Sequence, residues 1–373
     1  MRISDIRIES LDDGPQLSGR INDFRLWYRV PPGQPLSPRA DAFVAAAMLP
    51  AMRRGEPLEV EGADVSPMLL RGAERFQAIF NRWDRRFKRV DIRARTSPAV
   101  ALHDAVGSLF SGGIDGLYTL LRHRDEIDQL VFVRGIDMQI DNEELYQRVL
   151  QQNRQLASRL GKHLLPVASN IRGLLAPYGL SWCDLTGAGL ASIGLALGFP
   201  RLYIASSEPY ELLTAHGTHP LLDPCWSTEA LTIVHDGCEA ARREKLRAIV
   251  ELPGVLDSLR VCWQDDGYNC GRCEKCLRTM LALRLLGVQA TTFPPLRSLD
   301  PIRRLRVEQS YDVMGFEDNL QLAREVGDQE VVAVLEDILR RHRIKRAMVE
   351  LDLAFTGGRA KRTWRALRPQ PTH

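Results

Sequence analysis

The sequence predicts an α/β protein with a parallel sheet that is covered by helices on both faces. Short apolar runs alternate with segments of helical pattern through the middle of the chain. Such alternation is typical of strand–helix–strand units, in which each connecting helix packs on the sheet. The expected strands are residues 106–110, 130–133, 163–168, 202–205 and 231–234. The expected helices between them are residues 115–123, 143–160 and 185–197.

The first hundred residues predict a smaller α/β domain. Residues 23–30 alternate apolar and polar side chains, as a strand with one buried face does. Ser66 and Pro67 mark the start of a helix, because serine caps the first turn and proline fits its first position. The remaining expected elements are a helix at 40–53 and strands at 58–61 and 90–94.

Three domains are expected from these patterns. After Gly287 the chain reads as all-helical, with helices at 317–325 and 330–341 that could form a cap. The expected domains are a small N-terminal α/β domain at 1–98, a central domain at 99–288 and a helical C-terminal region at 289–373.

Composition points to a soluble globular protein. Hydrophobic residues make up 45% of the 373 residues and charged residues 26%, which excludes collagen-like and wholly disordered chains. The longest near-apolar stretch, 189–199, is shorter than the roughly 20 residues that span a bilayer. No secretory signal is visible at the N-terminus. We therefore expect a cytoplasmic protein and disfavour a membrane partner.

The formal net charge of +3 is unevenly distributed. Residues 340–373 carry ten Lys and Arg against only Glu350 and Asp352. Such a basic tail could contact nucleic acid or a membrane surface. We favour a solvated C-terminal helix and tail over a nucleic-acid partner, and the sequence leaves homo-oligomerisation open.

A glycine-rich turn follows the first strand of the central domain. The segment 107–116 reads GSLFSGGIDG and leads directly into a helix. Gly112 and Gly113 let the backbone approach a bound group, while Ser111 and the helix N-terminus supply donors for a phosphate or pyrophosphate. Asp115 would cap the helix or hold Mg²⁺. The spacing fits neither a Walker loop nor a dinucleotide fingerprint, and a plain turn is the alternative.

FSGGIDG resembles the SGGxDS signature of the PP-loop ATP pyrophosphatases. This superfamily includes 7-cyano-7-deazaguanine synthase, asparagine synthetase, GMP synthetase and tRNA thiolases. The resemblance implies a doubly wound, Rossmann-like parallel sheet that binds ATP, adenylates a carboxyl or carbonyl oxygen and releases pyrophosphate. It implies ATP-phosphate contacts at Ser111, Gly112, Gly113, Asp115 and Gly116, with Asp115 as the catalytic residue. The serine that the family has at the last of these positions is Gly116 here.

Four of the seven cysteines cluster in sequence. Cys262, Cys270, Cys273 and Cys276 are separated by seven, two and two residues. Four thiolates suit tetrahedral Zn²⁺. An Fe–S cluster or a redox pair would use the same side chains, but the compact spacing favours structural zinc. NCGRCEKCLR also resembles the CGxCxxC zinc segment of 7-cyano-7-deazaguanine synthases, and the whole resemblance covers roughly residues 104–288.

The long segment between the last two expected strands is a candidate substrate loop. Long loops in compact domains are often functional, and this one begins where strand ends face the ligand crevice of an open α/β sheet. A solvated loop is the alternative. The polar and aromatic side chains that could contact substrate are Glu208, His216, His219, Asp223 and Trp226.

These observations predict an ATP-dependent enzyme that uses ATP, Mg²⁺ and Zn²⁺. It would adenylate a small molecule and pass the activated group to a nitrogen nucleophile. An ATP-dependent sulfur transferase, with Cys183, Cys225 or Cys238 as sulfur carrier, is the second interpretation. A nucleotide-binding protein without turnover is the third, and Gly116 is its best support.

Overall fold

The computed structural model describes residues 1–305 and 310–356. The chain forms two compact units. The first consists of residues 1–270 with 290–292, and the second of residues 271–289 with the described residues from 293 onward. These boundaries differ from the three expected domains. The basic segment beyond Thr356 lies outside the described residues.

The first unit is built on a ten-stranded sheet with the order β10-β9-β6-β7-β8-β3-β2-β1-β4-β5. Six of its nine strand pairs are parallel. The molecule is therefore an α/β protein with a mostly parallel sheet, an arrangement compatible with a Rossmann-like fold.

The parallel half of the sheet confirms the five strands expected in the middle of the chain. They are β6 (Val106–Leu109), β7 (Gln129–Arg134), β8 (His163–Ser169), β9 (Arg201–Ala205) and β10 (Thr232–Asp236). From β6 the chain proceeds to β7 and β8 on one side, and β9 then pairs with the other edge of β6. The strand order thus reverses between β6 and β9.

The N-terminal strands continue this same sheet. The sequence pattern predicts β3 (Phe24–Arg29), β4 (Leu58–Val65) and β5 (Ile92–Thr96), but not β1 (Arg2–Leu11) or β2 (Gly14–Ile21). β3 pairs antiparallel with β8. The hydroxyl of Ser169 donates to Trp27 O at 2.8 Å, and Trp27 N donates to Asn170 Oδ1 at 3.0 Å. Residues 1–98 therefore share one sheet with the central part of the chain.

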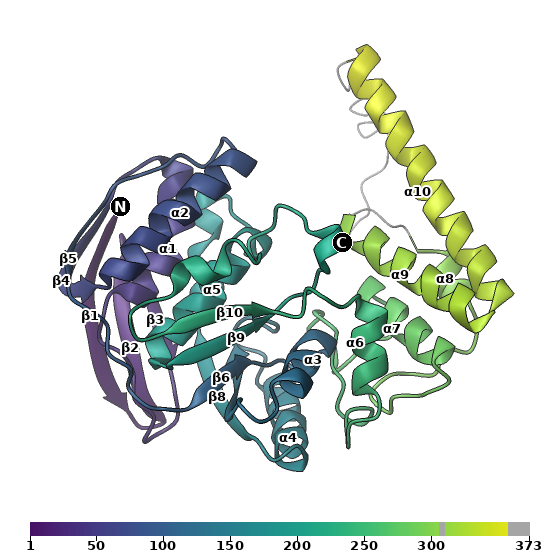
Figure 1. Ribbon diagram of the computed structural model, residues 1–373, viewed down its shortest axis with the longest axis horizontal. Helices are drawn as coiled ribbons and strands as arrows, with labels where there is room; N and C mark the ends of the chain where they lie inside the picture. Colours follow the sequence, from purple (N-terminus) through teal and green to yellow (C-terminus); the bar gives the residue numbers. More distant parts are fainter. Residues whose placement is uncertain (306–309, 357–373) are drawn as a thin grey trace. The chain divides into compact units, whose positions relative to one another are not determined.

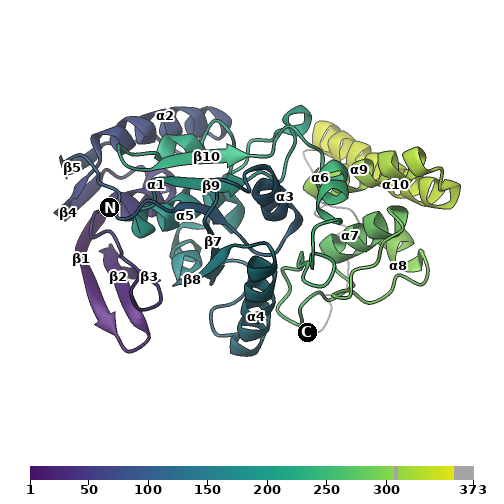
Figure 2. The same cartoon turned by 60° about the horizontal axis from the view of Figure 1, so that its bottom comes forward.

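Three helices lie together beside this sheet (Figures 1 and 2). They are α1 (Asp41–Arg54), α2 (Pro67–Trp83) and α5 (Trp182–Leu197). α1 is almost wholly buried, because its residues from Ala42 to Met52 are apolar on every side. The expected cap of α2 is confirmed, since Ser66 Oγ accepts from Leu69 N at 3.0 Å.

A carboxylate from the long loop anchors the start of α2. Glu229 accepts from Ser66 Oγ at 2.6 Å, from Met68 N at 2.9 Å and from Ala99 N at 3.2 Å. Burial opposes ionisation, but these donors outweigh it and lower the pKa of Glu229 to about 2. The loop before β10 is thereby joined to the N-terminal helices.

Two other helices of the first unit confirm the expected alternation, since α3 (Ile114–Arg122) follows β6 and α4 (Glu143–Arg159) follows β7. α6 (Arg242–Ile249) follows β10 and is not among the helices expected from the sequence. α3 packs against α6. Short 3₁₀ turns occupy Ile171–Leu174, Ala176–Tyr178, Tyr210–Leu212 and Asp223–Trp226.

The second unit is helical in its described residues, as expected. It contains α7 (Glu274–Leu285), α8 (Asp300–Arg303), α9 (Ser310–Val326) and α10 (Gln329–Thr356). α7 and α9 approach closely at Gly315, where a Cβ would lie 2.4 Å from Arg278 Nη1. Asn319 Nδ2 also donates to Arg278 O at 2.9 Å. Within the described residues, no helix combines the length and the apolar character that crossing a bilayer requires.

Candidate functional site: a glycine turn and a four-cysteine cluster

The glycine turn lies between β6 and α3, at the point where the strand order reverses. Gly112 has a φ of +79°, a conformation that L side chains rarely adopt. A Cβ there would lie 2.6 Å from Asn153 Oδ1, so glycine is required for space as well as for backbone conformation. Open α/β sheets bind ligands at the carboxyl ends of their strands, at such a reversal. The turn therefore occupies the expected place for a ligand.

Gly113 is the N-cap of α3, and no side chain caps this helix end. A Cβ on Gly113 would lie 3.4 Å from both Arg260 O and Ser111 Oγ, which are ordinary contacts. Side chains larger than alanine would fill the space beside the turn. The first N–H groups of a helix carry the positive end of its dipole, so this helix end favours an anion.

Two cations from α6 surround the carboxylate of Asp115. Arg242 Nη1 lies 2.9 Å from Asp115 Oδ2, and Lys245 Nζ lies 3.7 Å from Asp115 Oδ1. Lys245 is buried and donates to Ser206 O, just after β9, at 2.7 Å. Asp115 therefore holds two positively charged side chains beside the turn. The sequence pattern does not single out Arg242 or Lys245. Basic residues near the start of a helix that follows a strand are the signal that could have identified them.

Buried polar groups without partners lie beside the same turn. Arg260 N donates to Gly112 O at 3.0 Å, and the Arg260 side chain is only 3% exposed. Among the described residues, none forms a hydrogen bond with its Nε or Nη2, or with either amide atom of the fully buried Asn153. Buried polar groups are nearly always paired, so these groups are candidates for binding a polar ligand. Neither residue is singled out by the sequence.

The polar side chains of the candidate substrate loop make contacts within the protein. Glu208 accepts from Thr214 N at 2.8 Å and from Thr214 Oγ1 at 2.7 Å. His219 is 7% exposed and packs edge-on against Trp83, and burial lowers its pKa. Asp223 is fully buried. Glu208, His219 and Asp223, which the sequence predicts as substrate contacts, are therefore engaged with other parts of the protein.

Two further residues of this loop also have internal partners. Trp226 is fully buried against Phe76, with ring centroids 4.7 Å apart. His216 Nδ1 accepts from Thr218 N at 3.4 Å. A long polar segment between strands predicts exposure, but hydrogen bonds and aromatic contacts bury part of it, including His219, Asp223 and Trp226.

Asp223 pairs with His235 on β10. Asp223 Oδ2 lies 2.7 Å from His235 Nδ1, and the His235 side chain is 2% exposed. Burial alone would lower the pKa of His235, but interactions with Asp223 and Cys238 outweigh burial and raise it to about 9. The pair is therefore a buried imidazolium–carboxylate contact at neutral pH. His235 is a residue that sequence analysis misses.

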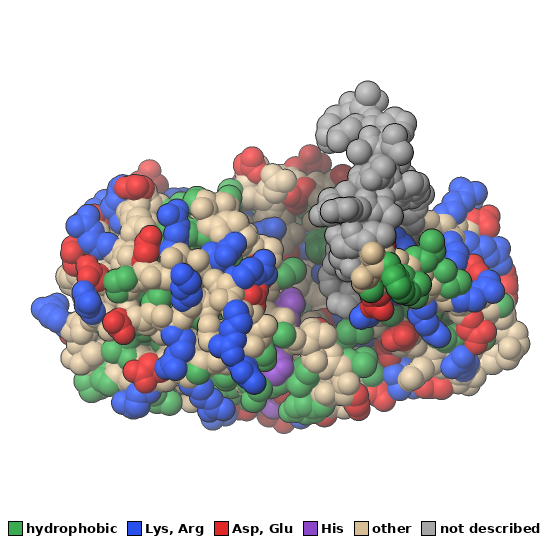
Figure 3. Space-filling view, turned by 90° about the horizontal axis from the view of Figure 1, so that it is seen from above, with side chains coloured by type: hydrophobic (Ala, Val, Ile, Leu, Met, Phe, Trp, Pro, Cys, Tyr) green, Lys and Arg blue, Asp and Glu red, His purple; other side chains and the backbone are tan. Residues whose placement is uncertain are grey.

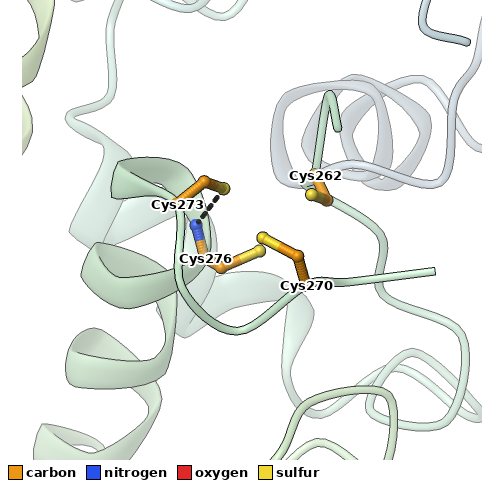
Figure 4. A group of neighbouring side chains, drawn as sticks. All are labelled: Cys262, Cys270, Cys273 and Cys276. Carbon is orange, nitrogen blue, oxygen red and sulfur yellow. Dashed lines mark hydrogen bonds between the residues drawn. The ribbon is translucent and has the colours of Figure 1, made fainter. Parts of the chain in front are cut away.

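The four clustered cysteines converge in the structure (Figure 4). The sulfur atoms of Cys262, Cys270, Cys273 and Cys276 all lie within 4.8 Å of one another. A tetrahedron with metal–sulfur bonds of about 2.3 Å has sulfur–sulfur edges of about 3.8 Å. The donor set and its spacing therefore fit a metal ion such as zinc. The three cysteines outside the cluster are Cys183, which is exposed, and Cys225 and Cys238, which are buried.

Local backbone groups organise this cluster. Cys273 caps the N-terminus of α7, where Cys276 N donates to its sulfur at 3.4 Å. Gln264 N donates to the sulfur of Cys262 at 3.4 Å. Such donors and the helix dipole stabilise thiolates. Gly271 has a φ of +68°, and a Cβ on it would lie 2.3 Å from Pro294 Cγ.

The side chain of Asn269 bonds to the backbone at the start of the segment. Its Oδ1 accepts from Val261 N at 3.0 Å and from Cys262 N at 3.2 Å. Its Nδ2 donates to Leu259 O at 2.9 Å and to Thr292 O at 3.3 Å. These bonds hold Cys262 and Cys270 close together in the loop.

Comparison of the chain with protein-family models, with curated proteins and with solved structures found no match.

Proposed function

We propose that this chain is a PP-loop ATP-dependent enzyme. It binds Mg·ATP at the turn formed by residues 111–116 and adenylates a carboxyl or carbonyl oxygen of a small molecule. Pyrophosphate leaves, and a nitrogen nucleophile then displaces AMP. The proposal rests first on the resemblance of FSGGIDG to the family signature.

The observation that carries the proposal is the convergence of donors on the turn. Arg242 and Lys245 bring two positive charges to Asp115, and the backbone N–H of the buried residue Arg260 donates to Gly112 O. Developing charge on a leaving pyrophosphate is stabilised by such fixed donors. Asp115 would also hold Mg²⁺, which would supply further positive charge beside the phosphates when bound.

For the cysteine cluster we propose structural zinc. Four thiolates leave no open position for a substrate, which distinguishes structural from catalytic zinc sites. Iron in the same thiolates would give an Fe–S cluster and a coloured protein.

We propose a small-molecule substrate over nucleic acid. On the face seen in Figure 3, the acidic and basic side chains of the described residues are interspersed. Nucleic-acid binding favours a stripe or patch of one sign, and this face offers none within the residues described.

The test is calorimetric titration of the full chain with Mg·ATP, followed by an assay for pyrophosphate release. Arg242→Gln and Lys245→Met should each weaken Mg·ATP binding about tenfold to a hundredfold, the value of one charge-assisted hydrogen bond. Arg247→Gln is the matched control, because it removes the same charge from an exposed position on α6. An equal loss in the control, or no Mg·ATP binding by the wild type, would refute the site.

Binding without turnover is the second candidate, favoured by Gly116 in place of the family serine. Tight Mg·ATP binding without pyrophosphate release, in the presence of candidate acids, would establish it.

A further inference from the structure

One polar side chain interrupts the buried face of α4. The buried residues of this helix are Leu145, Val149, Leu150, Asn153, Leu156 and Ala157, and all of them except Asn153 are apolar. Asn153 follows Val149 by four positions and precedes Leu156 by three, so it lies on the stripe of the helix that faces the core. An apolar residue is the usual occupant of such a position. Departures from this pattern occur mainly at functional or strained sites.

The amide of Asn153 makes no hydrogen bond with any described residue. Asn153 is 0% exposed, and both its Nδ2 and its Oδ1 lack a partner within the part of the chain that the structure describes. An amide group offers two donors and an oxygen that accepts up to two bonds. Leaving these bonds unmade in a buried position destabilises a fold. The amide therefore has its whole bonding capacity available to a polar ligand.

The amide lies directly against the glycine turn. Asn153 Oδ1 is 2.6 Å and Asn153 Nδ2 is 3.8 Å from the position that a Cβ on Gly112 would occupy. Gly112 and Asn153 are both buried, whereas Ser111, Gly113 and Asp115 are partly exposed. Solvent therefore reaches the turn at the residues beside Gly112, and the amide contacts the turn at its buried residue.

No hydrogen bond in the described part of the chain fixes which amide atom faces the turn. The last torsion of an asparagine side chain has a broad, two-fold profile, so rotation by 180° exchanges Oδ1 and Nδ2. With Nδ2 toward the turn, the amide donates to an anion bound there. It then adds to the backbone donors at the N-terminus of α3, which no side chain caps.

We propose that Asn153 is a phosphate-binding residue of the glycine turn, with its Nδ2 donating to an oxygen at the pyrophosphate end of Mg·ATP. This inference rests on the proposed function, which supplies the phosphate ligand. The amide completes its hydrogen bonds only when that ligand is bound. The unliganded protein is therefore less stable than a variant with an apolar residue at this position, although it binds the ligand more tightly.

A purely structural role for the amide predicts the opposite result. If a buried water bridged Asn153 to the surrounding backbone, the amide would stabilise the unliganded fold. Its replacement by an apolar residue would then lower stability and leave the affinity for ligand nearly unchanged. The signs of the two effects therefore distinguish ligand binding from support of the fold.

The experiment compares Asn153→Leu with the wild type as full-length proteins. Leucine is similar to asparagine in size and branching, and it removes both polar atoms. In calorimetric titrations, the affinities for Mg·ATP and for magnesium pyrophosphate should both fall about tenfold to a hundredfold, the value of one hydrogen bond to a charged group. The unliganded variant should unfold at a higher denaturant concentration than the unliganded wild type.

Gln151→Leu is the matched control, because it exchanges a side-chain amide for leucine at an exposed position on the same helix. It should leave both affinities unchanged. If Asn153→Leu does not fold, Asn153→Ala takes its place in the titrations. Alanine removes the same polar atoms, and it should weaken both ligands to a similar degree.

The outcomes separate this inference from the proposed function. Unchanged affinity for both ligands, or lower stability of unliganded Asn153→Leu, overturns the inference and leaves the proposed function intact. A loss of affinity for Mg·ATP alone overturns the contact with pyrophosphate. Failure of the wild type to bind either ligand overturns both proposals. Binding of pyrophosphate but not of Mg·ATP overturns only the proposed function, and the pyrophosphate titration of Asn153→Leu then decides the role of Asn153.

Discussion

The glycine turn at residues 111–116 and the cysteine segment at residues 262–276 are both short, and both were recognisable from residue type and spacing. They differ in where their chemistry comes from. The cysteine segment contains all four of its sulfur atoms, and Asn269 fixes the start of the segment mainly through bonds to Leu259, Val261 and Cys262. The turn itself contributes only backbone groups and the polar side chains of Ser111 and Asp115.

The polar groups beside the turn come from far along the chain. Arg242 and Lys245 bring their charges to Asp115 across more than 120 positions, and the Arg260 backbone and the Asn153 side chain come from two further segments. A local motif can thus carry a complete metal site, because thiolates are themselves the ligands. A site that binds phosphate needs positive charge, which glycine cannot provide. A glycine turn therefore obtains that charge only when folding brings distant basic residues beside it.

The largest expected effect is in the cysteine segment. Cys273→Ser removes one sulfur ligand and the cap of α7, so metal should be lost. Structural zinc contributes binding free energy on the order of 10 kcal/mol to folding. We therefore expect metal content to fall from about one ion per chain to near zero, with a large drop in the unfolding temperature.

Metal analysis and thermal unfolding measure both effects. Cys183→Ser, at an exposed thiol outside the cluster, should change neither. Wild-type protein without metal would refute the metal site, and a brown protein that contains iron would refute zinc.

The next prediction tests whether the turn binds Mg·ATP while contributing little to the stability of the fold. Gly113→Val places methyl groups in the space beside Arg260 O and Ser111 Oγ, while the backbone, with a φ of −88°, tolerates valine. Mg·ATP affinity should fall more than about a hundredfold, equivalent to about 3 kcal/mol. Unfolding by denaturant should change much less.

Gly116→Ala is the matched control in the same turn, since its Cβ meets only ordinary contacts at 3.4 Å or more. Unchanged Mg·ATP binding by Gly113→Val would show that the turn does not hold phosphate.

A third prediction concerns the buried charge pair beside the turn. The folded-state pKa of His235, about 9, lies above the unfolded value of about 6.5. Its stabilisation is therefore fully present below about pH 6.5 and is lost as pH rises through about 9. The two pKa values correspond to roughly 3 kcal/mol. Denaturant unfolding at several pH values should show this decline in wild type.

His235→Gln should flatten that decline between about pH 6.5 and 9. His163→Gln, at an exposed position at the start of β8, is the control and should leave the pH dependence intact. A wild-type stability that is constant over this interval would contradict a charged His235–Asp223 pair.

The smallest effect is expected at Gly116. A serine there fits, because its Cβ would lie 3.4 Å from Leu109 O and 3.6 Å from Phe110 Cδ2. One charge-assisted hydrogen bond is worth roughly 1.5–3 kcal/mol, which is about tenfold to a hundredfold in rate if it acts only in the transition state. Gly116→Ser should therefore release pyrophosphate at least as fast as wild type, with Gly116→Ala as the control without a hydroxyl.

Release of phosphate in place of pyrophosphate by wild type would overturn the reaction type. Release by neither wild type nor Gly116→Ser, despite tight ATP binding, would favour the binding-only candidate.

Much of this protein could be predicted because the relevant signals are local in the chain. The five strands from β6 to β10 are short apolar runs, and the cap of α2 is a Ser–Pro pair. The turn and the cysteine spacing depend on residue types a few positions apart. Such features follow from backbone geometry and ligand chemistry, which distant residues do not alter.

Only the tertiary structure decided which distant segments meet. The pairing of β3 with β8 merges residues 1–98 into the central sheet, a pairing that no local pattern specifies. Burial likewise decided the role of Asp223, which reads as a loop carboxylate in sequence but lies fully buried against His235. The physical reason is that hydrogen-bond partners and desolvation depend on packing across the whole fold, whereas residue type and spacing are properties of the chain itself.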